Sequence, residues 1–245
     1  MGRVAPVVPS DADTLCESCG YTLNGLPEIG NCPECGRPIA ESSPTLRDAP
    51  PWEQTGRGFF ATTREVLFHP ARFYRGLATR EGDRLAAARF ASWHFLLASL
   101  LFSATACAHV DWMLGLRSRR ALFAGDWLVF GVVVLVTSLM MYFVVKGVTR
   151  LAASLTAWEA AYRGFRLSRA VVLRGMNYHA AHYVPVVSFA FVTVWGYQVL
   201  VWLGVLRHSS ETWYLGLLCA EVIVGATFLF YTYWIAMRNM MYANR

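Results

Sequence analysis

Four long runs of apolar residues mark the chain after its first third. They cover residues 90–108, 127–145, 183–206 and 213–237. The first three runs contain no Asp, Glu, Lys or Arg, and the fourth contains only Glu221. A helix rises about 1.5 Å per residue, so ~20 apolar residues cross the ~30 Å hydrocarbon core of a bilayer. The pattern therefore predicts four transmembrane helices.

The alternative interpretation of such runs is a buried helix bundle in a soluble protein. Aromatic residues near the run ends favour the membrane, because Trp and Tyr collect at membrane–water interfaces. These residues are Trp93, Trp127, Tyr183, Trp213 and Trp234. Composition agrees, because 56% of the residues are hydrophobic and only 16% are charged, against about a quarter charged in soluble domains. We therefore expect an all-α membrane protein.

Two further segments mix apolar and polar positions at helical spacing. In residues 57–85, aromatic and aliphatic residues recur on one side and Arg fills much of the rest. Pro70 should divide this segment into two short helices, because Pro suits the first position of a helix. Residues 146–182 predict another amphipathic helix, followed by a new helix start near Ser168. We expect these helices to lie at the bilayer interface, although packing on a soluble partner would give the first segment the same pattern.

The N-terminal residues lack long apolar runs. We expect a disordered tail over residues 1–15, a cysteine-rich module over 16–37, a stiff Pro-rich linker over 38–56 and the helical membrane domain over 57–245. Residues 1–50 contain no apolar stretch of the length that a signal peptide needs. The first apolar run is therefore expected to serve as its own insertion signal.

Charge predicts the orientation in the membrane. The net charge is +6, and all 22 basic residues except Lys146 are Arg. Fifteen basic residues fall in segments 57–89 and 146–182 and in the tail after the fourth run. The opposite side receives four: Arg117, Arg119, Arg120 and Arg207. Since basic residues stay on the cytoplasmic side, both termini are predicted to be cytoplasmic. The preference for Arg suggests a GC-rich bacterial genome, and so the inner membrane.

Four of the six cysteines form the most specific motif of the chain. Cys16, Cys19, Cys32 and Cys35 are spaced C-x2-C-x12-C-x2-C, with Gly after each pair. Two thiolates with two residues between them can bind one metal ion from a tight turn. Two such turns supply the four ligands of a closed tetrahedral zinc site. A closed site predicts a structural zinc ribbon, in which metal binding supplies folding energy.

Three alternatives remain for these cysteines: disulfides, a rubredoxin-like iron site and a dithiol redox pair. The predicted cytosolic location disfavours disulfides, because thiols persist in a reducing compartment.

Between residues 16 and 37 there is one basic residue, Arg37, and there are three acids. The module is therefore not expected to bind nucleic acid.

Polar residues inside the apolar runs are candidates for function, because they are costly in a bilayer. Glu221 is expected to be neutral or hydrogen-bonded to a neighbouring span, with Gln198 as one possible partner. His94, His179 and His182 could join it in a metal or proton site. Because His179 and His182 are three residues apart, they share a helix face. We expect no catalytic residues with a recognised spacing.

Four stretches of the chain resemble two known groups of proteins. Residues 19–27, Cys-Gly-Tyr-Thr-Leu-Asn-Gly-Leu-Pro, and 32–36, Cys-Pro-Glu-Cys-Gly, resemble zinc ribbons at the front of many planctomycete proteins. Residues 66–74, Val-Leu-Phe-His-Pro-Ala-Arg-Phe-Tyr, and 174–180, Arg-Gly-Met-Asn-Tyr-His-Ala, resemble the Yip family, named for Ypt-interacting proteins, over about residues 57–240. This resemblance implies a helical membrane domain, usually of five spans. In eukaryotes it also implies trafficking partners and small GTPases.

Three functional hypotheses follow. The first is a non-enzymatic scaffold, or a trafficking or organisation factor, whose cytosolic zinc ribbon binds a protein partner or a second copy of the chain. The second is a small oligomeric transporter or channel that uses Glu221 and Gln198. The third, which has the least support, is a membrane enzyme with a metal at His179 and His182.

Overall fold

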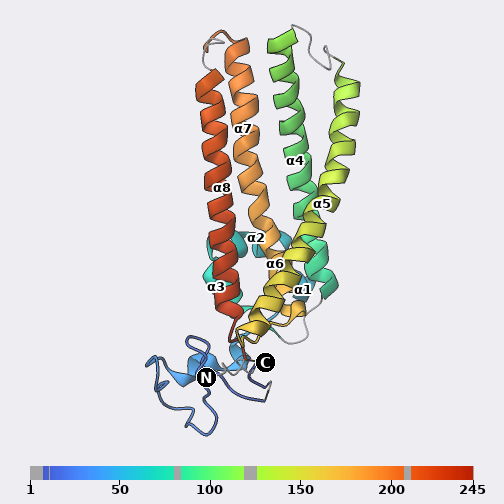
Figure 1. The fold of residues 1–245 in the computed structure, drawn as a ribbon. Helices are drawn as coiled ribbons and strands as arrows, with labels where there is room; N and C mark the ends of the chain where they lie inside the picture. The colour runs from blue at the N-terminus through green and yellow to red at the C-terminus, as the bar shows by residue number, and fades with distance from the viewer. Residues whose placement is uncertain (1–7, 11, 80–83, 119–125, 207–210, 245) are drawn as a thin grey trace. The chain divides into compact units, whose positions relative to one another are not determined.

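The computed structural model of the chain describes residues 8–10, 12–79, 84–118, 126–206 and 211–244. These residues form helices and no β-strand, so the fold is all-α (Figure 1). The elements in chain order are η1 (Ile39–Ser42), η2 (Pro44–Leu46), α1 (Pro51–Thr55), α2 (Phe59–Phe68), α3 (Pro70–Gly76), α4 (Arg84–Ser118), α5 (Trp127–Tyr162), α6 (Arg169–His179), η3 (Ala180–His182), α7 (Tyr183–Trp202) and α8 (Glu211–Met240).

Four helical stretches are long and apolar enough to cross a membrane, which confirms the predicted number of spans. They are Arg84–Gly115, Trp127–Tyr162, Arg169–Trp202 and Glu211–Met240. Each extends beyond one or both ends of the apolar run that predicted it, because helical hydrogen bonding continues past the part inside the bilayer. The third stretch ends at Trp202, before the end of its run at residue 206. The protein is an integral membrane protein.

The amphipathic segment after the second run is not a separate helix. It continues α5 without a break to Tyr162. Helix α5 ends where Gly164 adopts a left-handed φ of 77°. The Phe165 N–H then donates to the Ala160 carbonyl at 2.8 Å, and the Gly164 N–H to Ala161 at 3.2 Å, which is a Schellman cap. The sequence between the second run and this glycine contains no Pro, and Gly147 alone is too weak to stop a helix.

The two short helices predicted before the first span are present. Pro70 is the first residue of α3, and His69 separates it from α2. Helix α6 begins directly after Ser168, whose carbonyl accepts a hydrogen bond from the Val172 N–H at 3.0 Å. Both helix starts therefore lie where the sequence predicted them.

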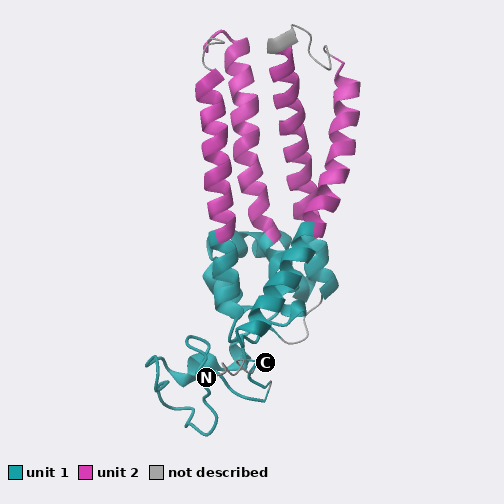
Figure 2. Cartoon of the chain, viewed as in Figure 1, with its two compact units in different colours: residues 1–91, 148–179, 231–245 teal, residues 92–147, 180–230 magenta. Residues whose placement is uncertain are grey.

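The chain divides into two compact units (Figure 2). Unit 1 comprises residues 1–91, 148–179 and 231–245, and unit 2 comprises residues 92–147 and 180–230. Unit 1 therefore joins the cysteine module and α1–α3 with α6 and the end of the chain, whereas composition divided the chain at residue 57.

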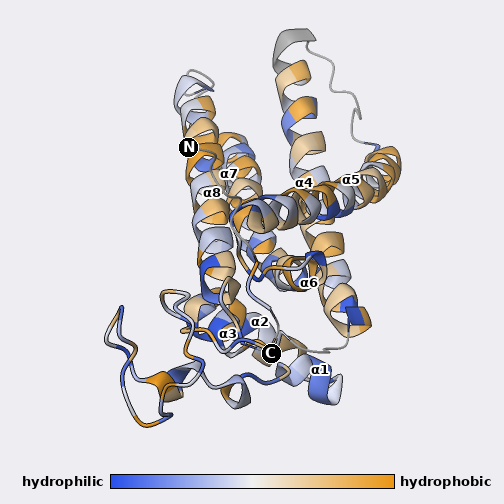
Figure 3. Cartoon of the chain, turned by 60° about the horizontal axis from the view of Figure 1, so that its bottom comes forward, coloured by the Kyte–Doolittle hydropathy of each residue, from blue (hydrophilic) through white to orange (hydrophobic). Residues whose placement is uncertain are grey.

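Unit 2 has a small core and a large apolar exterior. Its core cluster contains Ala108, Val194, Tyr197 and Tyr214, from α4, α7 and α8. Large apolar side chains elsewhere on these helices are exposed, such as Trp202 of α7 at 81% and Trp213 of α8 at 84%. Hydrophobic residues cover much of the length of the long helices (Figure 3). Such an exterior is incompatible with water but suits lipid tails.

Unit 1 has a conventional buried core. Val66, Tyr74, Phe90 and Tyr178 are fully buried, and the rings of Phe90 and Tyr178 lie 5.0 Å apart. This core brings α2, α3, α6 and the start of α4 together. It positions the segments that hold the cysteine module.

Residues 38–56, predicted as a linker, form η1, η2 and α1 and belong to unit 1. Of the predicted disordered tail, residues 1–7 and 11 lie outside the described residues. Within the described part, Leu15 is only 1% exposed. The arginines predicted on the far side of the membrane also lie outside the described part. They are Arg119, Arg120 and Arg207, together with the side chain of Arg117.

Candidate metal centre and the network that holds it

Two similar turns carry the four cysteines. In the first, the Cys16 carbonyl accepts from the Gly20 N–H at 2.8 Å; in the second, Cys32 accepts from Gly36 at 2.9 Å. Both glycines have left-handed φ values, 81° and 72°, which non-glycine residues rarely adopt. This is why each cysteine pair is followed by Gly.

The four sulfur atoms are close enough to hold one metal ion. The ligand atoms of Cys16, Cys19, Cys32 and Cys35 all lie within 4.8 Å of one another. Cys16 Sγ lies 3.5 Å from Cys35 Sγ, and Cys19 Sγ lies 3.6 Å from Cys32 Sγ. A tetrahedron with metal–sulfur bonds of ~2.3 Å has edges of ~3.8 Å, whereas a disulfide would need about 2.05 Å. The spacing fits metal ligation, and all four are free thiols.

Burial and backbone N–H groups have opposite effects on the pKa values of the cysteine thiols. Burial raises the pKa of Cys19 to about 12. Burial also opposes ionisation of Cys32, but the backbone N–H groups of Cys35 and Glu34 point at its sulfur and lower its pKa to about 7. Four thiolates cannot gather unless a cation compensates their charge. The cluster is therefore suited to a divalent metal ion.

A small apolar cluster supports the two turns. Leu23 is 3% exposed and packs with Leu26 and Ile39 beside the cysteines. Tyr21 is 38% exposed and is not part of this cluster. The module is too small for these contacts to fold it unaided.

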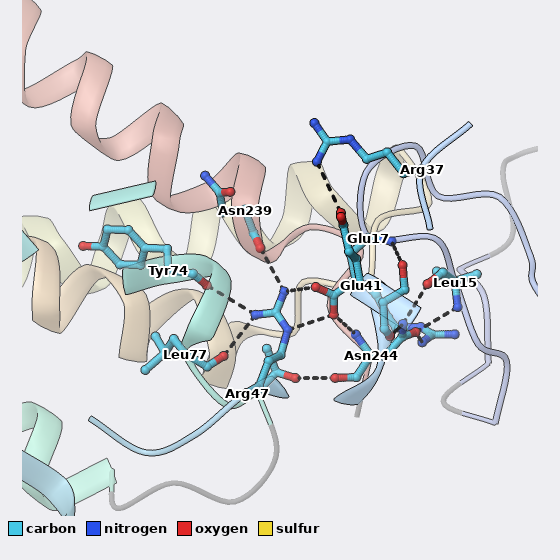
Figure 4. A network of polar contacts seen from close by, with 12 residues as sticks. Leu15, Glu17, Arg37, Glu41, Arg47, Tyr74, Leu77, Asn239 and Asn244 are labelled. Carbon is cyan, nitrogen blue, oxygen red and sulfur yellow. Dashed lines mark hydrogen bonds and ion pairs between the residues drawn. The ribbon is translucent and has the colours of Figure 1, made fainter. Parts of the chain in front are cut away.

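Glu17, within the first cysteine turn, ties the module to the rest of unit 1 (Figure 4). Both of its carboxylate oxygens accept hydrogen bonds from Arg47, at 2.8 and 2.7 Å. Arg47 also donates to the carbonyls of Tyr74 at 3.3 Å, Leu77 at 3.1 Å and Asn239 at 3.1 Å. One buried guanidinium therefore joins the module to the ends of α3 and α8.

Asn244 makes the second connection. Its side-chain amide donates to the Leu15 and Ser42 carbonyls, both at 2.7 Å, and its side-chain oxygen accepts from the Leu15 N–H at 2.8 Å. Its own N–H donates to Glu17 at 3.0 Å. No sequence pattern pointed to Arg47 or Asn244, because their partners are distant along the chain.

A separate buried network fixes α1 against α6. Arg174 donates to both oxygens of Glu53, at 2.9 and 2.6 Å, and the Tyr178 hydroxyl donates to Glu53 at 2.5 Å. The side chains of Glu53 and Arg174 are 2% and 7% exposed. Glu53 lies in the segment predicted as a linker, so this residue helps build the core of unit 1.

Glu221 is hydrogen-bonded to a neighbouring span, as expected, but its partner is not Gln198. Thr193 donates to Glu221 Oε1, while Gln198 donates to the Ala108 carbonyl at 3.0 Å. Glu221 Oε2 is buried and has no hydrogen-bond partner among the described residues. A further pair, which the sequence did not reveal, joins His109 Nδ1 to the Tyr214 hydroxyl at 2.6 Å.

The histidines of the described ranges do not form a second metal centre. His179 Nε2 lies 3.0 Å from Thr232 Oγ1, and the ring of His182 lies 5.6 Å from that of Phe228. His94 is buried, at 4% exposure. Within the described ranges, the four cysteines are the only group of three or more His, Cys, Asp or Glu residues whose ligand atoms gather.

Comparisons with models of protein families, with curated proteins and with solved structures found no match.

Proposed function

We propose that this chain is a membrane-embedded scaffold whose N-terminal module is a structural zinc ribbon that binds a protein partner. The observation that carries the metal assignment is the mutual approach of four cysteine sulfurs. Four thiolates in a tetrahedral set suit zinc and leave no ligand position open for a substrate. The metal would supply folding energy.

The proposed location is the bacterial inner membrane, with both termini in the cytoplasm. Free thiols are stable in that compartment, and the arginine-rich segments favour that side of the membrane. The Yip-like resemblance of residues 57–240 points to the same scaffold role. It adds no catalytic residues.

The module and the segment that follows it each expose an apolar side chain to a partner. Ile29 is 96% exposed and Leu46 is 61% exposed. Both lie outside the apolar runs, so lipid tails do not account for their exposure. A second copy of the chain or another protein would cover them.

Metal content of the detergent-purified protein tests the assignment. We expect about one zinc per chain, lost in Cys16→Ser/Cys19→Ser. Cys107→Ser/Cys219→Ser is the matched control, because these two cysteines lie in α4 and α8 and outside the cluster. Zinc retained by the first variant would refute the ribbon. Co-purification of a partner with wild type but not with Cys16→Ser/Cys19→Ser would support the scaffold role.

A transport function is the second candidate, because Glu221 keeps one buried carboxylate oxygen without a described partner. Glu221→Gln removes the exchangeable proton but keeps the shape. If the chain moves protons or cations, flux into proteoliposomes should be lost in this variant. Unchanged flux would exclude this use of Glu221.

A further inference from the structure

A cavity of about 560 Å³ lies beside the cysteine module in unit 1. One wall is the first cysteine turn with Cys16, Glu17 and Ser18, and another is α3 with Ala71 and Arg75. The last turn of α8 adds Arg238 and Asn239. Helix α8 is one of the four spans, so Arg238 lies where that span ends.

Two of the arginines that line this cavity have unused hydrogen-bond donors. Arg75 has no hydrogen-bond or ion-pair partner among the described residues, and it is exposed. Arg238 makes a weak contact of 4.0 Å with the Met241 sulfur. Ala71, one helical turn before Arg75, also lines the cavity. Both guanidinium groups are therefore available to a ligand.

The acids and carbonyls around the cavity are already occupied. Both oxygens of Glu17 accept from Arg47, and Glu41 pairs with Arg37 at 4.0 Å. Arg47 also covers the carbonyls at the ends of α3 and α8. These groups would otherwise repel an anion, because the C-terminal end of a helix is partially negative.

We propose that this cavity binds a phosphate group through Arg75 and Arg238, and that its natural source is the headgroup of an anionic phospholipid. A guanidinium presents paired N–H donors that match phosphate oxygens, so two free guanidiniums facing one cavity favour this ligand. The proposal does not depend on which metal the cysteines hold.

The charge balance favours a lipid over a free phosphate ion. Arg37, Arg47, Arg75 and Arg238 exceed Glu17 and Glu41 by two positive charges, but four thiolates around a divalent cation carry two negative charges. The field of the site is thus too weak to concentrate a soluble dianion. A phosphodiester held in the bilayer beside the end of α8 is already at high effective concentration. It carries a single charge, which two guanidiniums can hold.

The test uses the full chain in detergent, stripped of lipid, and native mass spectrometry with dioleoyl phosphatidylglycerol. We expect Arg75→Gln/Arg238→Gln to weaken phosphatidylglycerol binding about tenfold. The matched control is Arg57→Gln/Arg64→Gln, which removes two exposed arginines near α2 that do not line the cavity. The control should bind as wild type. Equal weakening in both variants, or in neither, would overturn the site.

Two further arms identify the source of the phosphate. Phosphatidylcholine should bind more weakly than phosphatidylglycerol, and inorganic phosphate should not displace phosphatidylglycerol at millimolar concentration. Binding of inorganic phosphate that depends on Arg75 and Arg238, without binding of phosphatidylglycerol, would overturn the lipid assignment. Unchanged zinc content of Arg75→Gln/Arg238→Gln would show that the module still folds, so that lost binding reports the site itself.

Discussion

The Arg47 guanidinium donates to both oxygens of the Glu17 carboxylate, with hydrogen bonds of 2.8 and 2.7 Å. The side chains are 3% and 12% exposed. Glu17 sits between two predicted metal ligands, and Arg47 holds the carbonyls that end α3 and α8. This pair therefore links the metal centre to the end of the last span.

Removal of one partner of this pair should be costly. Arg47→Gln leaves a buried carboxylate without its cation, and breaking a buried pair typically costs about 3–5 kcal/mol. We expect faster amide hydrogen exchange in the cysteine module and in residues 239–244. The exposed pair Glu65–Arg72, at 2.7 Å, is the matched control, and Arg72→Gln should cost less than about 1 kcal/mol. Similar exchange in both variants would contradict the link.

Metal removal should loosen the end of the chain. The ribbon holds Asn244 through Leu15 and Glu17, so chelation should raise hydrogen exchange at residues 239–244 as well as in the module. Amides in α6 serve as the internal reference, because Arg174 is held by Glu53 and not by the module. Protection that is unchanged at the chain end would show that the docking does not need the metal.

The two glycines after the cysteine pairs should differ in their tolerance of alanine. At Gly20 a Cβ atom would lie 2.6 Å from the Tyr242 ring, whereas at Gly36 nothing lies within 4 Å. Both positions have positive φ, which costs about 1 kcal/mol for alanine. Gly20→Ala should therefore lower zinc affinity more than Gly36→Ala, measured by competition with a chelator. Gly20→Ala/Tyr242→Ala should recover part of the difference.

Metal affinity should fall as the pH is lowered. The folded module depresses the pKa of Cys32 to about 7 from 9.0. The stabilisation that the Cys32 thiolate gives to the folded module is therefore present above pH 9. It is lost as the pH falls through 7, where the thiolate takes up a proton. The pKa of Cys19 is raised to about 12, so its thiol must release a proton to the solvent when metal binds. Chelator competition between pH 6 and 8 should show tighter binding at pH 8, with proton release on loading. A flat profile would contradict thiolate ligation.

Loss of the Glu53 charge should destabilise unit 1 more than loss of the hydrogen bond from Tyr178 to Glu53. Glu53→Gln leaves the buried Arg174 without its anion, which should cost about 3 kcal/mol or more. Tyr178→Phe removes one hydrogen bond to a charged group, worth about 1.5–3 kcal/mol. The melting temperature, followed by circular dichroism, should be lower for Glu53→Gln than for Tyr178→Phe. The reverse order would mean that the tyrosine, and not the ion pair, holds α1 on α6.

The sequence by itself determined the four spans and the cluster of four cysteines, because each depends on local chemistry. An apolar run as long as residues 127–145 needs lipid whatever its neighbours do. Two cysteines with two residues between them bring their sulfur atoms together in one turn, and the Gly that follows permits that turn. The break at Pro70 and the start after Ser168 are local in the same way.

Tertiary structure alone decided how these parts are joined. Glu17 and Arg47 are 30 residues apart, and Leu15 and Asn244 are 229 apart. No periodicity records such pairs, because each side chain alone resembles a solvated surface residue. The same holds for Glu221, which accepts a hydrogen bond from Thr193, whereas Gln198, the partner suggested from the sequence, donates to the Ala108 carbonyl. Partner choice depends on the rotation and packing of whole helices, which many residues set together and no short motif encodes.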